Sequence, residues 1–440
     1  MLPLIRREAG ERFAYSHTQQ ITTAQFCADV MSVAESLPDQ RYLINLCHNR
    51  YTFITTFFAA LVRGQTNLLP SNRDLVSNRA HAAQFPSLSI VADDEVEGID
   101  HVIRLDAGQN GNQPTPGCDA EHMAAIAFTS GSTGQPQRHP KSFAMLDTWR
   151  QIHARYLKLA VDDERLAIVA TVPCWHMYGL EWAMLLPTVA SAQIFCGADF
   201  FPKDVVQAIN ASTNKVILVS TPLHLKALSK TQAPSHPVAT IISATAPLDE
   251  PLMRQIETHL DSQVFEIYGC SEIGSLAYRF PAQKPAWTFF DCFDLQFDDG
   301  EMTVNHTLLD EPVKLADHFE RAGESSYQLK GRTTDIVKVG GKRESLARLN
   351  SILNQIPGVE DGVIYDPVSY QQAATGRLAA LVVAPELDRH AIRTALSAQV
   401  DTAFIPRPIR LVDALPRSAT SKLQQRELTA LINQQRSTDD

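Results

Sequence analysis

A segment rich in hydroxyl and glycine residues, FTSGSTGQP (128–136), directly follows the apolar run AAIAF. Glycines let a loop approach a ligand closely, and backbone N–H groups together with hydroxyl oxygens can surround phosphate oxygens. The segment is not a Walker A loop, because no G-K-[ST] closes it. It therefore predicts a phosphate-binding loop of another kind, with candidate ligands Thr129, Ser130, Gly131, Ser132, Thr133 and Gly134.

Six further segments carry polar residues that could do chemistry. Glu272 offers a hard oxygen ligand at the carboxyl end of a predicted strand, where α/β sheets bind ligands. Other residues of this set have ordinary explanations when taken alone, since a lone Asp often caps a turn and a lysine that opens a surface helix is normally solvated. In chain order the segments are VPCWHMYGLE (172–181), SATAPL (243–248), YGCSE (268–272), LADHFE (315–320), GRTTDIVKVGGKR (331–343) and LPRSATSKLQQREL (415–428).

In this order and spacing, the segments resemble the motifs of adenylate-forming enzymes, which include acyl- and aryl-CoA synthetases, peptide-synthetase adenylation domains and luciferases. The resemblance covers about residues 120–430. It implies that ATP and Mg²⁺ activate a carboxylic acid as an acyl-adenylate with release of pyrophosphate. It also implies transfer of the acyl group to the thiol of coenzyme A or of a carrier-protein phosphopantetheine. Details of 129–141 and 172–181 resemble a short bacterial branch found with aryl-polyene and pigment pathways.

The resemblance implies a role for each candidate residue. Lys422 falls on the family's catalytic lysine, Glu272 and Thr133 fall on its magnesium site, and His176 borders its acyl pocket. Besides the loop 129–134, the nucleotide would contact Ser243, Ala244, Tyr268, Gly269, Ser271, Asp317 and Arg332. The acyl pocket would be lined by Trp175, His176, Tyr178, Thr245 and Ala246, and these side chains favour a small aromatic or short acyl substrate. The hinge and the thiol-binding loop would comprise Thr334, Asp335, Lys338, Gly340 and Gly341.

Three positions depart from the family pattern and leave a second function open. Gln137 stands where a lysine is usual, Thr334 stands at the pivot position, and Ser421 replaces a glycine. Arg138, His139 or Lys141 could supply the charge that Gln137 lacks. The alternative is a non-catalytic nucleotide-binding or carrier-docking protein derived from this fold. A dinucleotide oxidoreductase is excluded, because no G-x-G-x-x-G follows the first strand.

The elements that must position these residues are predicted from periodicity. From about residue 120, short β-branched runs alternate with amphipathic stretches, which predicts an α/β protein with a mostly parallel sheet covered on both faces. The predicted strands are 41–46, 124–129, 165–171, 192–196, 215–220, 238–243 and 263–267, and the predicted helices are 20–36, 49–63, 203–211, 222–230 and 249–260. Antiparallel hairpins are expected after residue 281, for example at 297–305. The last unit should contain helices near 345–355, 388–400 and 421–434 and strands near 362–366 and 378–384.

We expect two domains: a large N-terminal domain, 1–331, with a shortened N-terminal subdomain, and a small mobile α+β lid, 332–440. Residues 331–440 contain 14 Lys/Arg and 12 Asp/Glu, or +2, so the remaining 330 residues carry 25 minus 37, or −12. A slightly basic lid over an acidic domain suits an anionic ligand, although ordinary scatter of composition explains the charges equally well.

The composition limits the ligands and the cellular location that the chain could have. The 440 residues have a net charge of −10, which argues against general affinity for nucleic acid. The seven cysteines never form C-x-x-C, which is typical of reduced cytosolic thiols. The N-terminus shows no signal peptide, and the apolar run 53–62 is about half the length that spans a bilayer. We therefore expect a cytoplasmic protein that acts on a small carboxylic acid and uses coenzyme A or an acyl carrier protein as its partner.

Overall fold

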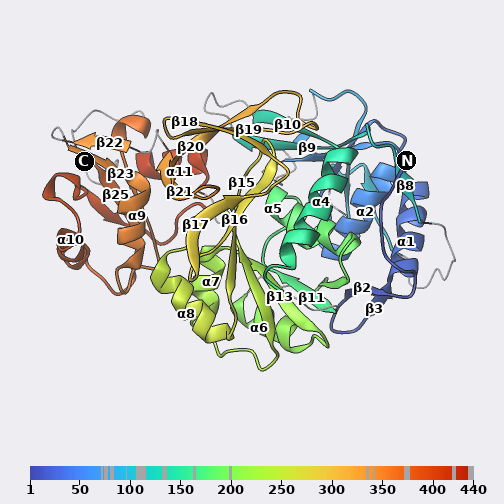
Figure 1. Cartoon of the computed structure of the whole chain (residues 1–440), viewed down its shortest axis with the longest axis horizontal. Helices are drawn as coiled ribbons and strands as arrows, with labels where there is room; N and C mark the ends of the chain where they lie inside the picture. The colour runs from blue at the N-terminus through green and yellow to red at the C-terminus, as the bar shows by residue number, and fades with distance from the viewer. Residues whose placement is uncertain are drawn as a thin grey trace. The chain divides into compact units, whose positions relative to one another are not determined.

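The structure is a computed structural model of the chain, and it contains two compact units (Figure 1). It describes residues 1–70, 73, 78–79, 84–95, 97–105, 115–130, 136–161, 165–197, 201–332, 336–339, 342–370, 377–418 and 423–434. The first unit comprises Met1–Asp294 and Asn305–Val313, and the second comprises Leu295–Val304 and Lys314–Asp440. These units group residues by contact, whereas the predicted boundary at 331/332 concerns a hinge, so that boundary stays a prediction. Within the described ranges, no helix is both long enough and apolar enough to cross a membrane.

A six-stranded sheet occupies the N-terminal part of the first unit. Its order is β10-β9-β5-β4-β6-β7, with all neighbours parallel except β10, which is antiparallel to β9. Helix α2 (Arg50–Val62) is buried from Tyr51 to Leu61, because apolar side chains occur on every side of it. The other elements here are β1 (Leu2–Pro3), α1 (Thr23–Ser36), β4 (Tyr42–Asn45), β5 (Thr66–Leu69), β6 (Leu88–Ala92), β7 (His101–Val102), β8 (Gly117–Cys118), β9 (Met123–Ser130) and β10 (Pro136–Ser142).

A second sheet of the first unit carries the strands that were predicted from β-branched runs. Its order within this unit is β17-β16-β15-β14-β13-β11-β12-β2-β3. The strands from β15 to β2 are parallel, and antiparallel strands flank them on both sides. The bounds are β2 (Arg12–Tyr15), β3 (Gln20–Thr22), β11 (Leu166–Ala170), β12 (Ala192–Phe195), β13 (Lys215–Ser220), β14 (Val238–Ser243), β15 (Val264–Cys270), β16 (Gly274–Phe280) and β17 (Lys284–Phe289).

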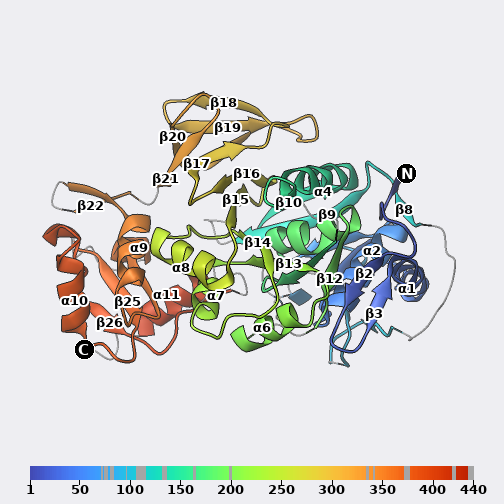
Figure 2. The same cartoon turned by 60° about the horizontal axis from the view of Figure 1, so that its bottom comes forward.

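Helices cover both faces of this second sheet, as the strand and helix alternation predicts. On one face lie α6 (Pro202–Asn210), α7 (Pro222–Leu228) and α8 (Glu250–Leu260), whose apolar side chains share one core with alternate strand residues (Figure 2). On the other face the ring of Phe265 contacts Trp182, with ring centroids 5.9 Å apart. Trp182 belongs to a π-helix, Leu180–Leu185, which follows α5 (Met177–Gly179) and precedes a 3₁₀ turn, Leu186–Thr188. Parallel strands covered on both faces are apolar on both faces, which explains their nearly continuous apolar sequences.

The second unit contains an antiparallel group, β18-β19-β20-β21, and an α+β region. In the α+β region, Val382 and Ala380 of β25 face a core with α9 and α10, whereas Leu381 and Val383 face a core with α11. The three-stranded sheet therefore has helices packed on both of its faces. The bounds are β18 (Asp294–Asp298), β19 (Glu301–Asn305), β20 (Val313–Arg321), β21 (Tyr327–Arg332), β22 (Ile336–Val339), β23 (Lys342–Ser345), α9 (Leu346–Gln355), β24 (Asp361–Tyr365), β25 (Ala379–Val383), α10 (Arg389–Ser397), β26 (Ile409–Leu411) and α11 (Gln425–Gln434), with 3₁₀ turns at Pro367–Tyr370 and Thr402–Phe404.

Two predicted helices differ from the observed ones. The predicted helix 20–36 begins only at Thr23, because Gln20–Thr22 pairs with β2 and the Thr22 hydroxyl caps the helix by accepting from the Gln25 N–H. The predicted helix 421–434 is observed as α11 from Gln425, and its first residues lie partly outside the described ranges. Helix α4 (Phe143–Leu157), which the predictions omit, is amphipathic and is capped by the Ser142 hydroxyl, which accepts from the Met145 N–H.

Candidate active site

The predicted phosphate loop joins β9 to β10 in an antiparallel hairpin. Thr129 and Ser130 end β9, where their backbones pair with Gln137 and Pro136. Gly131, Ser132, Thr133 and Gly134 lie outside the described residues. The structure thus gives the two strands that hold the loop and leaves the predicted phosphate contacts untested.

The basic residues that could replace the missing lysine at position 137 lie on two opposite faces of strand β10. Successive side chains on a strand point to opposite faces. Arg138 is exposed, and its guanidinium lies 4.5 Å from the centre of the Phe85 ring and donates to Gln84 Oε1 at 2.9 Å. His139 and Lys141 point the other way and are both buried.

Lys141 is the more deeply buried of these two, with 0% of its surface exposed. Its ammonium group donates a hydrogen bond to the backbone carbonyl of Glu272. Burial lowers the pKa of Lys141 to about 8, and the nearby Cys270, Glu181 and Glu272 oppose that shift. A cation therefore lies directly beneath the turn that carries the predicted magnesium ligand.

A buried carboxylate, Glu181, contacts the same turn from the π-helix. It is 1% exposed and accepts hydrogen bonds from the Ser275 N–H at 3.0 Å and the Ser275 hydroxyl at 2.6 Å. Burial raises the pKa of Glu181 to about 7, whereas the Ser275 hydrogen bonds and the charge of Lys141 act in the opposite direction. Because π-helical turns occur often at functional sites, the position of Glu181 on one is notable in itself.

Three buried side chains thus anchor the backbone between residues 272 and 275. Lys141 binds the Glu272 carbonyl, the indole of Trp149 donates to the Ile273 carbonyl at 2.9 Å, and Glu181 accepts from Ser275. They come from β10, α4 and the π-helix respectively. The Glu272 side chain itself is exposed, so a fixed backbone presents its carboxylate to solvent.

Glycine is required at both ends of this turn. A Cβ at Gly269 would lie 2.4 Å from the Gly274 carbonyl oxygen. Gly274 has φ +124°, and a Cβ there would lie 2.0 Å from Glu181 Oε1. The turn therefore closes more tightly than other residues allow.

We expect Gly274→Ala to lower the free energy of unfolding by about 2–3 kcal/mol, because it adds both backbone strain and a clash with Glu181. Thermal or chemical unfolding would measure the change. Gly10→Ala is the matched control, since nothing lies within 4 Å of a Cβ at that exposed glycine. Equal stability losses in the two variants would contradict the steric argument.

The predicted acyl-pocket segment 172–181 is anchored by hydrogen bonds. The hydroxyl of Tyr178 donates to the carbonyls of Ser220 at 3.1 Å and Ile242 at 2.8 Å, so this ring joins the ends of β13 and β14. His176 caps α5, with its Nδ1 accepting from the Tyr178 N–H at 3.4 Å. Burial raises the pKa of Tyr178 well above its usual value, so this hydroxyl acts as a hydrogen-bond donor.

Trp175, in the same segment, is half-buried against two groups from the N-terminal part of the unit. Its ring contacts Phe53 with centroids 5.8 Å apart, and the guanidinium of Arg73 lies 3.9 Å from the Trp175 ring centre. Arg73 also donates to the carbonyls of Asn45 and Cys47. The stacking holds the indole in one orientation.

The turn 243–248 carries strain that is typical of a binding site. Thr245 has φ +81°, which is unusual for a β-branched residue. Ser243 is fully buried, and its hydroxyl has no hydrogen-bond partner within the described residues. The turn is fixed by Glu266, whose carboxylate accepts from the Leu248 N–H at 3.1 Å and pairs with Arg279 at 2.6 Å. Ala244 is buried, and Ala246 is exposed.

Other predicted nucleotide and thiol residues lie in the second unit. Asp317 of β20 is the register partner of Arg332 of β21, so two predicted ribose and phosphate ligands are neighbours. Lys338 is exposed on β22, which pairs with β23. Thr334, Asp335, Gly340, Gly341 and Lys422 lie outside the described residues, so their roles remain predictions.

In the first unit, Tyr268 and Ser271 flank the anchored turn. The Tyr268 ring lies 5.8 Å from that of Trp287, measured between centroids. Both Tyr268 and Ser271 are half-buried, and Gly269 between them is exposed. The predicted nucleotide residues of YGCSE thus share one short segment with Glu272.

Sequence reasoning missed Glu181 and the anchoring role of Lys141 and Trp149. A weak signal was present: Glu181 and Lys141 are single charges beside apolar or turn-forming residues. Their partners, however, are 94 and 131 positions away along the chain.

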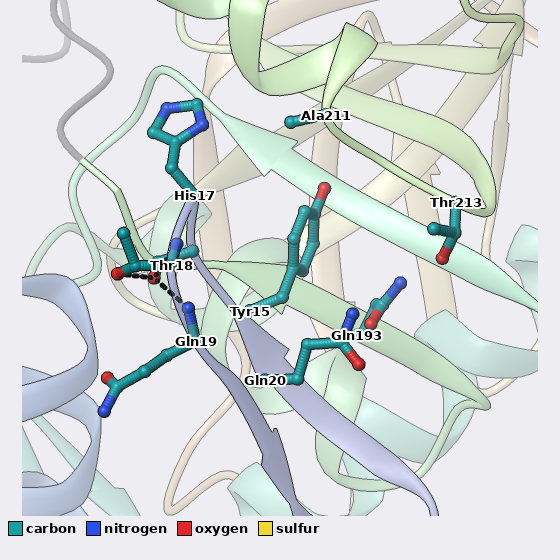
Figure 3. Close-up of a pocket in the computed structure, with 9 residues that line it drawn as sticks. Tyr15, His17, Thr18, Gln19, Gln20, Gln193, Ala211 and Thr213 are labelled. Atoms are coloured by element: carbon teal, nitrogen blue, oxygen red, sulfur yellow. Dashed lines mark hydrogen bonds between the residues drawn. The ribbon is translucent and has the colours of Figure 1, made fainter.

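A polar pocket of about 380 Å³ lies elsewhere in the first unit and contains none of the predicted site residues (Figure 3). Its side chains come from the turn between β2 and β3, from β12 and from the segment before β13. This pocket does not enter the argument for the active site.

The residues present fit a magnesium ion. Within the described part of the chain, no three His, Cys, Asp or Glu side chains gather into a metal cluster. Glu272 offers an exposed carboxylate, which suits Mg²⁺, because this ion commonly binds one or two carboxylates together with substrate phosphates.

Known proteins resemble this chain in sequence and in fold. A sequence model of the family described as AMP-binding enzyme matches residues 41–290. The chain is 26% identical over 246 residues to 4-coumarate--CoA ligase of Rhodobacter capsulatus, which covers 55% of this chain and 60% of that enzyme, less than two thirds of its length. It is 20% identical over 314 residues to 3,4-dihydroxybenzoate--[aryl-carrier protein] ligase of Bacillus anthracis, covering 70% of this chain and 74% of that enzyme. The fold is similar to that of O-succinylbenzoate coenzyme A synthetase from Bacillus subtilis in complex with AMP, with a TM-score of 0.77, 16% identity and 95% of each chain covered.

Proposed function

The chain belongs to the AMP-binding enzyme family, and from this premise we propose that it is an AMP-forming ligase that joins a carboxylic acid to a thiol. The observation that carries the proposal is the anchored turn at 272–275, which presents Glu272 from the end of a parallel sheet. The relatives named as CoA and aryl-carrier-protein ligases support the same reaction class.

The proposed chemistry has two steps. In the first, a carboxylate oxygen of the substrate bonds to the α-phosphorus of ATP, and the bond from that phosphorus to the bridging oxygen breaks, releasing pyrophosphate. In the second, the thiol sulfur bonds to the acyl carbon, AMP leaves with the former carboxylate oxygen, and the thiol proton passes to solvent. Two anions must meet in the first step, so positive charge and positioning matter more than covalent catalysis.

The residues of the chain would divide this work. Magnesium, when bound, would neutralise phosphate charge, and Glu272 with Thr133 would hold it. Asp317 would hold the ribose with Arg332 beside it, and the loop 129–134 would hold the phosphates. Lys422 would stabilise the charge that accumulates between the carboxylate and the α-phosphate. After adenylate formation, the small domain would rotate to withdraw Lys422 and bring Gly340 and Gly341 to the thiol.

The proposed substrate is a small aromatic or short acyl acid. Support comes from Trp175 and Tyr178, two bulky side chains in the segment predicted to line the pocket, both held in place by contacts with other elements. The acceptor is either coenzyme A or a carrier-protein phosphopantetheine, and relatives of both kinds match the chain.

We expect acid-dependent exchange of labelled pyrophosphate into ATP, strongest with small aryl or short acyl acids. A screen of aryl, short and medium acids would measure it, and product formation with coenzyme A against a phosphopantetheinylated carrier protein would identify the acceptor. Absence of exchange with every acid, in protein that still binds ATP, would favour the non-catalytic alternative.

A further inference from the structure

Lys141 lies outside every motif on which the proposed function rests, yet it contacts the turn that carries the proposed magnesium ligand. It is fully buried on β10, the second strand of the phosphate hairpin, and its ammonium binds the Glu272 carbonyl. A buried ammonium without compensating charge is strongly unfavourable. A specific arrangement must therefore compensate it.

The neighbouring Cys270, Glu181 and Glu272 favour the charged form of Lys141, and Glu181 is the one among them that is buried and contacts the same turn through Ser275. Its carboxylate is also buried, and the charges of Lys141 and Glu181 stabilise each other. Glu181 simultaneously fixes Ser275, whose hydroxyl accepts from the Trp182 indole at 2.9 Å. Lys141 and Glu181 thus hold the turn at residues 272 and 275 by hydrogen bonds from two different elements.

The anchored backbone determines the direction in which the Glu272 side chain points. A metal ligand is effective when supporting hydrogen bonds hold it in place, and loss of such supports typically costs metal affinity about 10–100-fold. Here the supports act on the backbone of the ligand itself and on the backbone of Ile273 and Ser275. They also link the phosphate hairpin to the turn, so that two predicted phosphate-contacting segments keep a fixed spacing.

We propose that Lys141 and Glu181 are positioning residues for magnesium-dependent nucleotide binding: together they hold the 272–275 backbone so that Glu272 faces the bound ion. This inference rests on the proposed function for the identity of the ion and the nucleotide. It gives Lys141 a role in this hairpin although position 137 is glutamine. Lys141 acts through the turn and not by contact with phosphate.

The test measures binding of a fluorescent ATP analogue as a function of Mg²⁺ concentration, without any acid substrate. Lys141→Met and Glu181→Gln should each raise the Mg²⁺ concentration for half-maximal binding about 10-fold or more. The double variant should be shifted by less than the product of the two single shifts, because each residue compensates the other. Hydrogen exchange should become faster at the Ser275 amide in both single variants.

Asp147→Asn is the matched control. Asp147 is a buried carboxylate of α4, but its partners are Arg6, Arg150 and Gln151 and not the turn. The Asp147→Asn protein should have a lower free energy of unfolding, but its Mg²⁺ concentration for half-maximal nucleotide binding should equal that of the wild type. The inference is overturned if folded Lys141→Met and Glu181→Gln proteins keep the wild-type Mg²⁺ dependence within about twofold, or if Asp147→Asn is shifted as much.

If Lys141→Met does not fold, the inference is tested by the Mg²⁺ dependence of Glu181→Gln and by the hydrogen-exchange rate of its Ser275 amide. The proposed function fails separately, when the wild-type protein shows Mg²⁺-dependent nucleotide binding but no acid-dependent pyrophosphate exchange. A wild-type protein whose nucleotide binding is independent of Mg²⁺ would overturn this inference directly.

Discussion

Replacing Lys422 with alanine is expected to abolish adenylate formation while leaving ATP binding almost unchanged. The ammonium would stabilise negative charge that accumulates only as the carboxylate approaches the α-phosphate, so its loss raises the barrier without weakening the ground state. Removal of one such stabilising group typically costs about 10²–10³-fold in rate. Pyrophosphate exchange measures the rate, and titration with a fluorescent nucleotide measures binding.

Lys203→Ala is the matched control for Lys422→Ala. Lys203 is an exposed lysine in the first turn of α6, which is the ordinary surface role that Lys422 would have if it were not catalytic. The control should exchange pyrophosphate at the wild-type rate. Retention of more than about a tenth of the rate in Lys422→Ala, a loss under about 1.4 kcal/mol, would contradict the assignment. The same variant should still transfer a preformed acyl-adenylate to the thiol, because the proposed mechanism withdraws Lys422 in that step.

The parallel sheet could be predicted from the sequence because its strands are buried on both faces. KVILVS (215–220) coincides with β13, and the proline at position 251 lies in the first turn of α8, where a missing N–H is not needed. Periodicity and capping are local properties, so one segment suffices to reveal them.

Strand β10 could not be predicted in the same way. Its sequence, PQRHPKS, contains two prolines and five polar residues, which is typical of a loop. The prolines are tolerated because β10 is the edge strand of its sheet, where one side of the backbone needs no partner. Only the pairing with β9 reveals the strand, and that pairing buries Lys141.

The side chains that support the site could not be predicted from the sequence either, because their contacts, like the pairing of β10 with β9, form only in the tertiary fold. Burial of Glu181 depends on Ser275, and burial of Lys141 depends on Glu272, contacts that bring distant segments together. A sequence shows which residues could bind a phosphate or an ion. The groups that orient those residues are determined by the tertiary fold, and here they are of three kinds: one cation, one indole and one carboxylate.

Replacing Glu272 with glutamine is expected to reduce pyrophosphate exchange about 10²–10³-fold, the second largest effect. The substitution keeps the shape of the side chain and the backbone contacts of Lys141 and Trp149, but it removes the negative charge that a hard cation prefers. Because the Glu272 side chain is exposed, the variant should unfold at nearly the wild-type temperature. Exchange should be measured at several Mg²⁺ concentrations, and high concentrations should restore part of the rate.

The comparison between Glu272→Gln and Glu181→Gln separates the ligand from its support. Both replace one carboxylate by an amide, but Glu272 is exposed, whereas Glu181 is buried and bound to Ser275. Glu272→Gln removes the ligand itself, so it should raise the Mg²⁺ concentration for half-maximal exchange most and leave the free energy of unfolding unchanged. Glu181→Gln removes the support, so it should raise that Mg²⁺ concentration and also lower the free energy of unfolding. Glu257→Gln serves as a control, since this carboxylate of α8 accepts from the Val264 N–H at the start of β15, the end of that strand opposite to the turn. An exchange rate in Glu272→Gln within about threefold of that control would show that Glu272 does not bind the ion, because ligand loss costs far more.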